Sequence, residues 1–314
     1  MSDYSLPFQE PVFHDEHAAR QALENLRWPD GPYCPHCGNS NQDLIAKVEG
    51  KKQTHRPGLY YCNECKGQFT VTVGTVFERS KVPLTKWWAA AHMMNSSKNG
   101  VSAHEIHRNL GVTYRTAWFM MHHLREAMID PMPSPMGSNG GAVQSDETYH
   151  LNTSKRAKGF KHGFKAKAQI VALIDEETKT ARTFHVEKGV NVAKIQDILF
   201  QNVKRGATLV TDEAGVYIEI GKEYASHQTM KHTAGEYVNA KGYTTNNVEN
   251  FFGIFKRGMR GTYTFCGEQH LKRYLVEFEF RYNNRAALGI NDGERTMRTL
   301  KGIEGKRLTY RSAH

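Results

Sequence analysis

Three acidic residues occupy positions from which they could hold metal ions together. Asp146 follows the apolar run 142–145, and Asp212 follows the apolar run 208–211. Glu249 lies in the first turn of an expected helix. A carboxylate at the end of a buried strand is costly without a nearby cation, so the pattern favours a divalent-metal site. Two Mg²⁺ or Mn²⁺ ions about 3.5–4 Å apart would activate the attacking oxygen and neutralise the leaving one in phosphoryl transfer.

A lysine accompanies the third of these acids. Lys256 follows Glu249 by seven positions, almost two helical turns, so both side chains lie on one helix face. Lys256 would hold a phosphate backbone near the metals, and Arg257 beside it is a further candidate DNA contact. Glu147 and Glu213 adjoin the two aspartates and are alternative ligands. Each acid taken singly is equally compatible with a turn, a cap or a first-turn helix residue.

Two C-x-x-C pairs predict a second kind of metal site. They are formed by Cys34 and Cys37 and by Cys62 and Cys65, and a glycine follows each pair closely. Four thiolates that converge in this way form a closed, structural Zn²⁺ site, here a zinc ribbon. The alternatives are two disulfides or a thioredoxin-like pair; an intracellular location argues against the first, and the presence of two matched pairs argues against the second. The fifth cysteine, Cys266, is expected to be a core thiol.

Residues 97–128 have the layout of a helix-turn-helix. Ser102 with Glu105 forms a capping box, Gly111 makes the turn, and Thr113 caps a second helix that runs to about residue 128. The second helix of such a unit enters the DNA major groove, with its first residues nearest the bases. The expected DNA contacts are Thr113, Tyr114, Arg115 and, farther along, Arg125. An ordinary α-hairpin would have similar apolar spacing.

Composition limits the class of protein. The chain has 314 residues, with 42 Lys plus Arg against 32 Asp plus Glu and a net charge of +10. That excess favours a polyanionic partner, either nucleic acid or an acidic membrane surface. No apolar stretch is long enough for a transmembrane helix, and the first residues lack the features of a signal peptide. We therefore expect a cytoplasmic protein with a mixed α+β fold.

The order of patterns along the chain predicts its domains. The clearest boundary is the Pro- and Gly-rich stretch 131–141, which separates an N-terminal part from a region where helices and strands alternate. The expected strands are 142–151, 168–175, 181–186 and 208–211, and the expected helices include 15–28, 192–203, 247–257 and 269–282. The predicted domains are a helical segment (1–30), a zinc ribbon (31–80), a helix-turn-helix region (81–130), a linker (131–141), a catalytic domain (142–290) and a C-terminal tail (291–314).

The motifs together resemble a known family, the ISXO-like insertion-sequence transposases of bacteria. The resemblance rests on the order of ribbon and helix-turn-helix, then Ser-Asp-Glu-Thr-Tyr at 145–149, Thr-Asp-Glu at 211–213, Asn-Asn-Val-Glu-Asn-Phe-Phe at 246–252, and the pattern over 256–283. It implies a catalytic domain with a ribonuclease-H-like fold and a DDE triad of Asp146, Asp212 and Glu249, accompanied by Lys256. Some members have Asn at the third position, and Asn246, Asn247 and Asn250 lie close by; the spacing to Lys256 favours Glu249.

The leading hypothesis is therefore a DNA transposase that binds terminal inverted repeats and target DNA, acts as a homo-oligomer on DNA and has no membrane partner. The main alternative is a catalytically inactive regulator that keeps the ribbon and the helix-turn-helix. A ribonuclease-H-like nuclease or resolvase is a third possibility with the same metal site. A complete Asp/Asp/Glu set favours an enzyme, because a regulator has no use for it.

Overall fold

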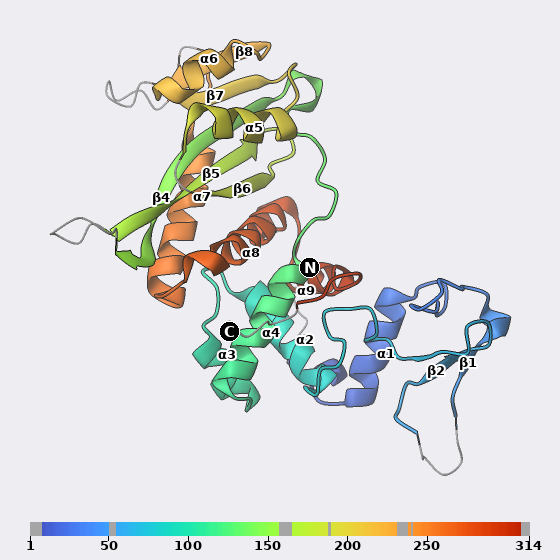
Figure 1. Cartoon of the computed structure of the whole chain (residues 1–314). Helices are drawn as coiled ribbons and strands as arrows, with labels where there is room; N and C mark the ends of the chain where they lie inside the picture. The colour runs from blue at the N-terminus through green and yellow to red at the C-terminus, as the bar shows by residue number, and fades with distance from the viewer. Residues whose placement is uncertain are drawn as a thin grey trace. The chain divides into compact units, whose positions relative to one another are not determined.

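The computed structural model describes residues 8–49, 55–156, 165–187, 190–230, 238–239 and 241–308; for 151–156 and 165–167 it describes the backbone only. The chain divides into two compact units. Unit 1 consists of Met1–Ile129 with Ala286–His314, and unit 2 consists of Asp130–Arg285 (Figure 1). In the part of the chain that the structure describes, no helix is long and apolar enough to cross a membrane.

Unit 1 combines a small antiparallel sheet with helices. Its α-helices and strands are α1 (Glu16–Arg27), β1 (Ile45–Lys47), β2 (Tyr60–Cys62), β3 (Gln68–Phe69), α2 (Leu84–Ser96), α3 (Ala103–Leu110), α4 (Tyr114–Ala127) and α9 (Asp292–Lys301). Short 3-10 turns lie at Pro11–Phe13, Gln42–Leu44 and Ala286–Leu288. The sheet order is β1-β2-β3.

Helix α1 packs on this small sheet. The Tyr60 hydroxyl donates to Glu24 Oε2 at 3.0 Å, and the Trp28 ring meets the rings of Tyr60 and Phe69 edge-on. The Arg27 guanidinium donates to two backbone carbonyls beyond β3. The N-terminal helical segment and the cysteine-bearing region therefore share one core and form one folded body.

The C-terminal region packs into unit 1. Residues 291–314 are expected to form a tail, but the structure places helix α9 there, packed against α2. Asn95 Nδ2 donates to Thr299 Oγ1 at 3.0 Å, and the Thr296 hydroxyl lies 3.3 Å from His92 Nδ1. Thr296 and Thr299 are fully buried. A helix that buries threonines lacks the apolar periodicity that would have revealed it.

Unit 2 is built on one mixed sheet, with strands in the order β6-β5-β4-β7-β8. Its elements are β4 (Ala142–Arg156), β5 (Lys165–Asp175), β6 (Ala181–Val186), α5 (Val192–Asn202), β7 (Thr208–Asp212), α6 (Ile218–Gly221), β8 (Ser226–Met230), α7 (Asn246–Gly258) and α8 (Leu271–Asn283). It also has 3-10 turns at Ser138–Gly140, Gly215–Tyr217 and Glu268–His270, and a π-turn at Met259–Tyr263. Strands β4, β5 and β6 are antiparallel, and β4, β7 and β8 are parallel.

Each face of this sheet has its own core. Helices α7 and α8 cover one face, where Phe251, Phe255 and Phe278 pack on Ile170 and Ile174. Helix α5 covers the opposite face with a second apolar cluster, which includes Val143, Leu209 and Tyr217. Figure 1 shows α7 and α8 together on one side of the sheet. Side chains alternate between faces along a strand, so each position of β4 points to one core or the other.

Part of the expected linker is packed into unit 2. Met136 is buried, and its backbone N–H donates to Asn202 O at 2.8 Å. Gly137 has φ of +70°, and a Cβ there would lie 2.3 Å from Ala207 Cβ, so this position requires glycine. The Gly-rich composition that suggested a linker serves close packing here. Strand β8 was not predicted either, because its sequence Ser-His-Gln-Thr-Met is mostly polar.

Candidate active site

Asp146 and Asp212 come together through the pairing of two parallel strands. The last paired residues of β4 and β7 are Gln144 and Val210, and the two aspartates each lie two positions farther on. Because side chains alternate, both aspartates lie on the same face as Gln144. The apolar run 142–145 suggests that Asp146 lies at the end of a strand. Strand β4 continues past Asp146, so this residue lies within a long strand.

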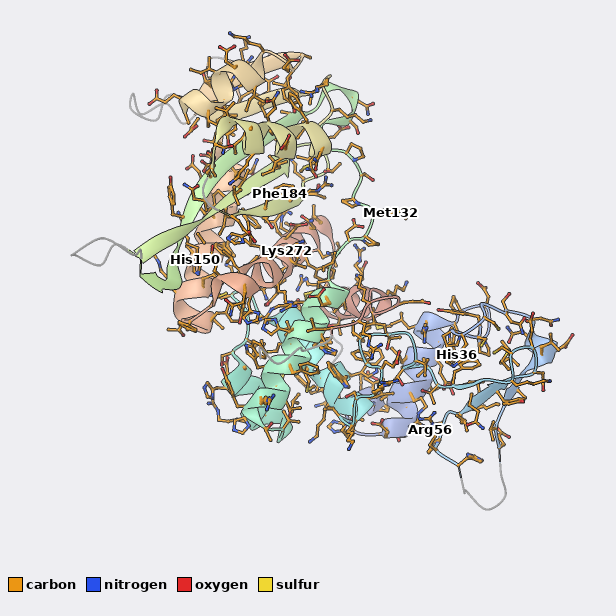
Figure 2. The ribbon with its side chains drawn as sticks, viewed as in Figure 1. His36, Arg56, Met132, His150, Phe184 and Lys272 are labelled. Carbon is orange, nitrogen blue, oxygen red and sulfur yellow. The ribbon has the colours of Figure 1, made fainter. Side chains whose placement is uncertain are left out.

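Helix α7 supplies the third acid from the same face. Two contacts bracket Asp146 and place α7 beside β4: Val248 N–H donates to Gln144 Oε1 at 3.0 Å, and the rings of His150 and Phe255 are 5.6 Å apart. Figure 2 labels His150 on β4. Glu249 directly follows Val248 and is exposed, whereas Asp146 and Asp212 are half-buried. The Thr245 hydroxyl donates to Glu249 Oε1 at 2.7 Å, a contact that sequence analysis did not anticipate.

The charges of the other predicted residues affect the pKa of Asp146. The pKa of Asp146 is raised to about 6, mainly by burial and also by the charges of Asp212 and Glu249, while the Glu147 N–H and Lys256 act in the opposite direction. The Glu147 N–H donates to Asp146 Oδ1 at 2.7 Å, and the Ala214 N–H donates to Asp212 Oδ1 at 3.0 Å. The other three residues predicted to be catalytic therefore all influence the Asp146 carboxylate.

The two neighbouring glutamates take other positions. Glu147 lies on the opposite face of β4, where its carboxyl and the Ser145 hydroxyl both hydrogen-bond to the buried Tyr217 hydroxyl. Burial raises the pKa of Glu147 to about 7. Glu213 is exposed just after β7. Strand alternation thus separates Asp146 from Glu147 and directs Asp146 toward α7.

The carboxylate set suits a hard divalent cation, because carboxylate oxygens are the ligands that Mg²⁺ and Mn²⁺ prefer. Among the described residues, only the four cysteines have ligand atoms that all lie within 4.8 Å of one another. The carboxylate oxygens of Asp146, Asp212 and Glu249 do not all lie within this distance of one another. Asp146, Asp212 and Glu249 would hold such a cation by closing this gap.

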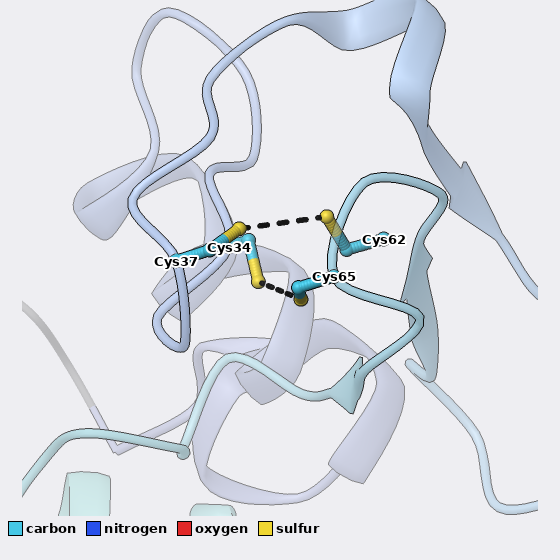
Figure 3. Close-up of side chains that lie close together, drawn as sticks. All are labelled: Cys34, Cys37, Cys62 and Cys65. Carbon is cyan, nitrogen blue, oxygen red and sulfur yellow. Dashed lines mark hydrogen bonds between the residues drawn. The ribbon is translucent and has the colours of Figure 1, made fainter.

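The four predicted zinc ligands form a compact cluster in unit 1. Cys34 Sγ lies 3.6 Å from Cys65 Sγ, and Cys37 Sγ lies 3.8 Å from Cys62 Sγ (Figure 3). All four thiols are free, so neither pair forms a disulfide. Tetrahedral Zn–S bonds of about 2.3 Å place sulfur atoms about 3.8 Å apart, in agreement with these distances. Hydrogen bonds, chiefly from the Cys65 N–H, lower the pKa of Cys62 to about 6, whereas burial raises the pKa of Cys65.

Helices α3 and α4 have the local structure that the sequence predicts. The Ser102–Glu105 capping box is present, Gly111 has φ of +59°, and Thr113 Oγ1 accepts from the Thr116 N–H at 3.1 Å. Thr113, Tyr114 and Arg115 are exposed at the start of α4. The rings of His104 and Tyr114 are tilted against each other, with their centroids 4.4 Å apart.

One predicted DNA contact does not lie on this surface. Arg125 is 1% exposed, and its Nη1 lies 3.5 Å from His122 Nδ1. The expectation that Arg125 contacts DNA is therefore wrong for this structure, because α4 turns that position inward. Arg257, in contrast, is exposed on α7 next to Lys256.

Known proteins share both regions of the chain. Residues 139–283 match the ISXO2-like transposase domain, and residues 14–68 match the transposase zinc-ribbon domain. A relative from Halobacterium salinarum, named "Uncharacterized protein in transposable element ISH50", is 23% identical over 86% of this chain and 92% of its own length.

Two solved structures are also similar. One is the simian T-cell lymphotropic virus intasome in complex with PP2A regulatory subunit B56 gamma, with TM-score 0.29, 16% identity, and coverage of 55% of this chain and 63% of that one. The other is the Mos1 transposase paired-end complex with left transposon end, with TM-score 0.20, 10% identity, and coverage of 61% and 78%. The two family domains cover more than half of the sequence, in the order that the motifs predicted, and the chain belongs to the ISXO2-like DNA transposases.

Proposed function

We propose that this protein binds the ends of an insertion sequence and catalyses metal-dependent DNA strand cleavage and strand transfer. The observation that carries the proposal is the convergence of Asp146, Asp212 and Glu249 on one face of the unit 2 sheet, with Lys256 on the same helix. The strand order supports a ribonuclease-H-like fold, with an antiparallel trio extended by two parallel strands. The two aspartates lie where the trio meets the parallel pair.

The residues of this site would act in distinct ways. Bound Mg²⁺ or Mn²⁺ would supply Lewis-acid chemistry that activates an attacking oxygen and stabilises a leaving one. The Glu147 N–H donates to the Asp146 carboxylate, and the Thr245 hydroxyl donates to the Glu249 carboxylate. These hydrogen bonds orient both carboxylates. Lys256 would bind a neighbouring phosphate of the DNA backbone.

Unit 1 is proposed to recognise DNA. Thr113, Tyr114 and Arg115 form an exposed polar and aromatic surface at the start of α4, as expected for the second helix of a helix-turn-helix. We propose that Arg257 contacts the DNA backbone from unit 2. The four cysteines would bind one structural Zn²⁺ that closes the ribbon. Because two ends must be cut and joined, we propose that the protein assembles as a homo-oligomer on DNA.

A cleavage assay tests this function. The full-length protein is incubated with Mg²⁺ and DNA that carries the terminal repeats, and nicked and joined products are resolved on a denaturing gel. Asp212→Asn and Glu249→Gln are expected to lower the cleavage rate on the order of 1,000-fold, because metal ligation contributes several kcal/mol and each 1.4 kcal/mol is a factor of ten. Both variants should bind the DNA ends normally.

Glu147→Gln is the matched control, since this half-buried glutamate faces Tyr217 and not α7. It should retain most activity. Normal cleavage by Glu249→Gln combined with an inactive Asn246→Ala would move the third ligand to Asn246. End binding without cleavage by the wild-type protein, under Mg²⁺ and Mn²⁺ alike, would instead favour the inactive regulator.

A further inference from the structure

Gln144 is a fully buried polar residue beside the proposed active site. It lies on β4 two positions before Asp146 and on the same face of the sheet. Nothing in the proposed chemistry uses its side chain. A buried amide is tolerated only when its hydrogen-bonding groups are satisfied, so its contacts indicate what it does.

The two ends of the Gln144 amide contact two different elements. Its Oε1 accepts from the Val248 N–H at 3.0 Å, and its Nε2 donates to Glu176 Oε1 at 2.6 Å. Val248 lies in the first turn of α7, where backbone N–H groups have no partner within the helix. The preceding Thr245 does not cap this turn, and its hydroxyl donates to Glu249 instead. Gln144 thus caps α7 from the neighbouring strand.

The chemistry of both partners requires an amide at this position. A backbone N–H only donates, and an ionised carboxylate only accepts, so Gln144 has to present its oxygen to Val248 and its nitrogen to Glu176. Methionine has a similar length but makes neither hydrogen bond. Glutamate keeps the acceptor for Val248 but places a second carboxylate against Glu176.

This link joins the segments that carry two of the proposed metal ligands. Asp146 is two strand positions from Gln144, about 7 Å along β4, and Glu249 is the residue after Val248. The edge-to-face ring contact of His150 with Phe255 also packs α7 on β4, farther along both elements. The Gln144 hydrogen bonds are directional and set the position of the helix start.

We propose that Gln144 is a positioning residue that fixes the first turn of α7 on β4 and so sets the spacing between Asp146 and Glu249 for a divalent cation. This inference rests on the proposed function. Residues that orient metal ligands typically change metal affinity about 10- to 100-fold when they are replaced. Gln144 should act in this range although it touches no metal.

The test measures metal affinity directly. Mn²⁺ is titrated into the full-length, zinc-loaded protein, free Mn²⁺ is followed by electron paramagnetic resonance, and thermal melting is recorded alongside. Gln144→Met and Gln144→Glu are expected to raise the Mn²⁺ dissociation constant at least about 10-fold. The double variant Gln144→Glu with Glu176→Gln exchanges the two groups and rebuilds both hydrogen bonds. It should return the Mn²⁺ dissociation constant to within about 3-fold of the wild-type value. This is a smaller change than the roughly 10-fold or greater loss expected when residues that orient metal ligands are replaced.

Two controls separate the possible failures. Ser145→Ala removes a buried contact with Tyr217 on the opposite face, 3.0 Å in length, and should lower the melting temperature without changing Mn²⁺ affinity. Asp146→Asn should abolish the Mn²⁺ site.

If Asp146→Asn binds Mn²⁺ like the wild type, the proposed active site itself is wrong. If Asp146→Asn loses the metal while Gln144→Met keeps it, only the positioning role is overturned. Should Gln144→Met fail to fold, the double variant decides, and a folded double variant with weak Mn²⁺ binding overturns the inference.

Discussion

Asp146 should make the metal-free protein less stable at neutral pH than at mildly acidic pH. Burial and the nearby charges of Asp212 and Glu249 raise its pKa from the ordinary 3.8 to about 6. The folded state therefore binds this proton more tightly than the unfolded chain does. The resulting destabilisation is complete above pH 6, shrinks as the pH falls from 6 toward 4, and vanishes below the unfolded value.

The size of this effect follows from the pKa difference. At 1.36 kcal/mol for each pH unit, the penalty reaches about 3 kcal/mol at pH 7.5 and falls to about 1 kcal/mol at pH 4.5. The first figure is an upper limit, because solvent reaches part of the side chain and screens its charge. Asp146→Asn removes the penalty and keeps the Oδ1 acceptor for the Glu147 N–H. We expect the variant to melt roughly 5–10 °C higher at pH 7.5, since a domain of this size shifts about 2–4 °C per kcal/mol.

Calorimetry without added Mg²⁺ measures this shift. No chelator is used, because a chelator would also remove zinc from the ribbon. The gain in melting temperature should be clear at pH 7.5 and much smaller at pH 4.5. Added Mg²⁺ should stabilise the wild type and leave Asp146→Asn unchanged. Glu213→Gln serves as the control, since this exposed acid should not produce the same pH-dependent gain. An equal gain for Asp146→Asn at both pH values, or no gain at all, would refute the reasoning.

Four further predictions concern the ribbon and the DNA contacts. Metal analysis should find about one zinc per chain, and Cys62→Ser should lose it and unfold the ribbon as seen by limited proteolysis; a folded variant without zinc would contradict the cluster's role. Arg115→Ala should cost about 1–3 kcal/mol on the cognate end and relax base preference in binding assays, whereas equal losses on random DNA would show a backbone contact. The buried Arg125→Ala should lower the melting temperature far more than it lowers DNA affinity. Lys256→Ala should reduce the cleavage rate less than Asp212→Asn does, because it removes no metal ligand. It should lower the slope of the logarithm of DNA affinity against the logarithm of salt concentration by about one, because it removes a phosphate contact.

Several features of this protein could be predicted from the sequence because their signals are local. The two cysteine pairs need only the right residues at the right spacing, and the sulfur atoms do converge. The capping box at Ser102 and the turn at Gly111 depend on neighbours a few positions away. The same holds for strands 168–175 and 181–186, and for the helix that carries Glu249 and Lys256, whose spacing alone puts them on one face.

Tertiary structure decided which of two adjacent acids faces α7. Asp146 and Glu147 are chemically similar, and alternation shows only that they face opposite ways. The choice follows from packing: α7 lies on the face of Asp146, while Tyr217 receives Glu147 on the other. Packing likewise buried Arg125, and it drew the polar helix α9 into unit 1 through contacts with α2.

The role of Gln144 shows the same limit at the level of one side chain. In the sequence it is a single glutamine in a strand, and its partners Glu176 and Val248 are distant along the chain. The sequence by itself determined which residue types were available and which local elements carry them. Only the folded structure placed the Val248 N–H and the Glu176 carboxylate within hydrogen-bonding distance of the buried Gln144 amide. A hydrogen bond depends on distance and direction, and long-range packing sets both.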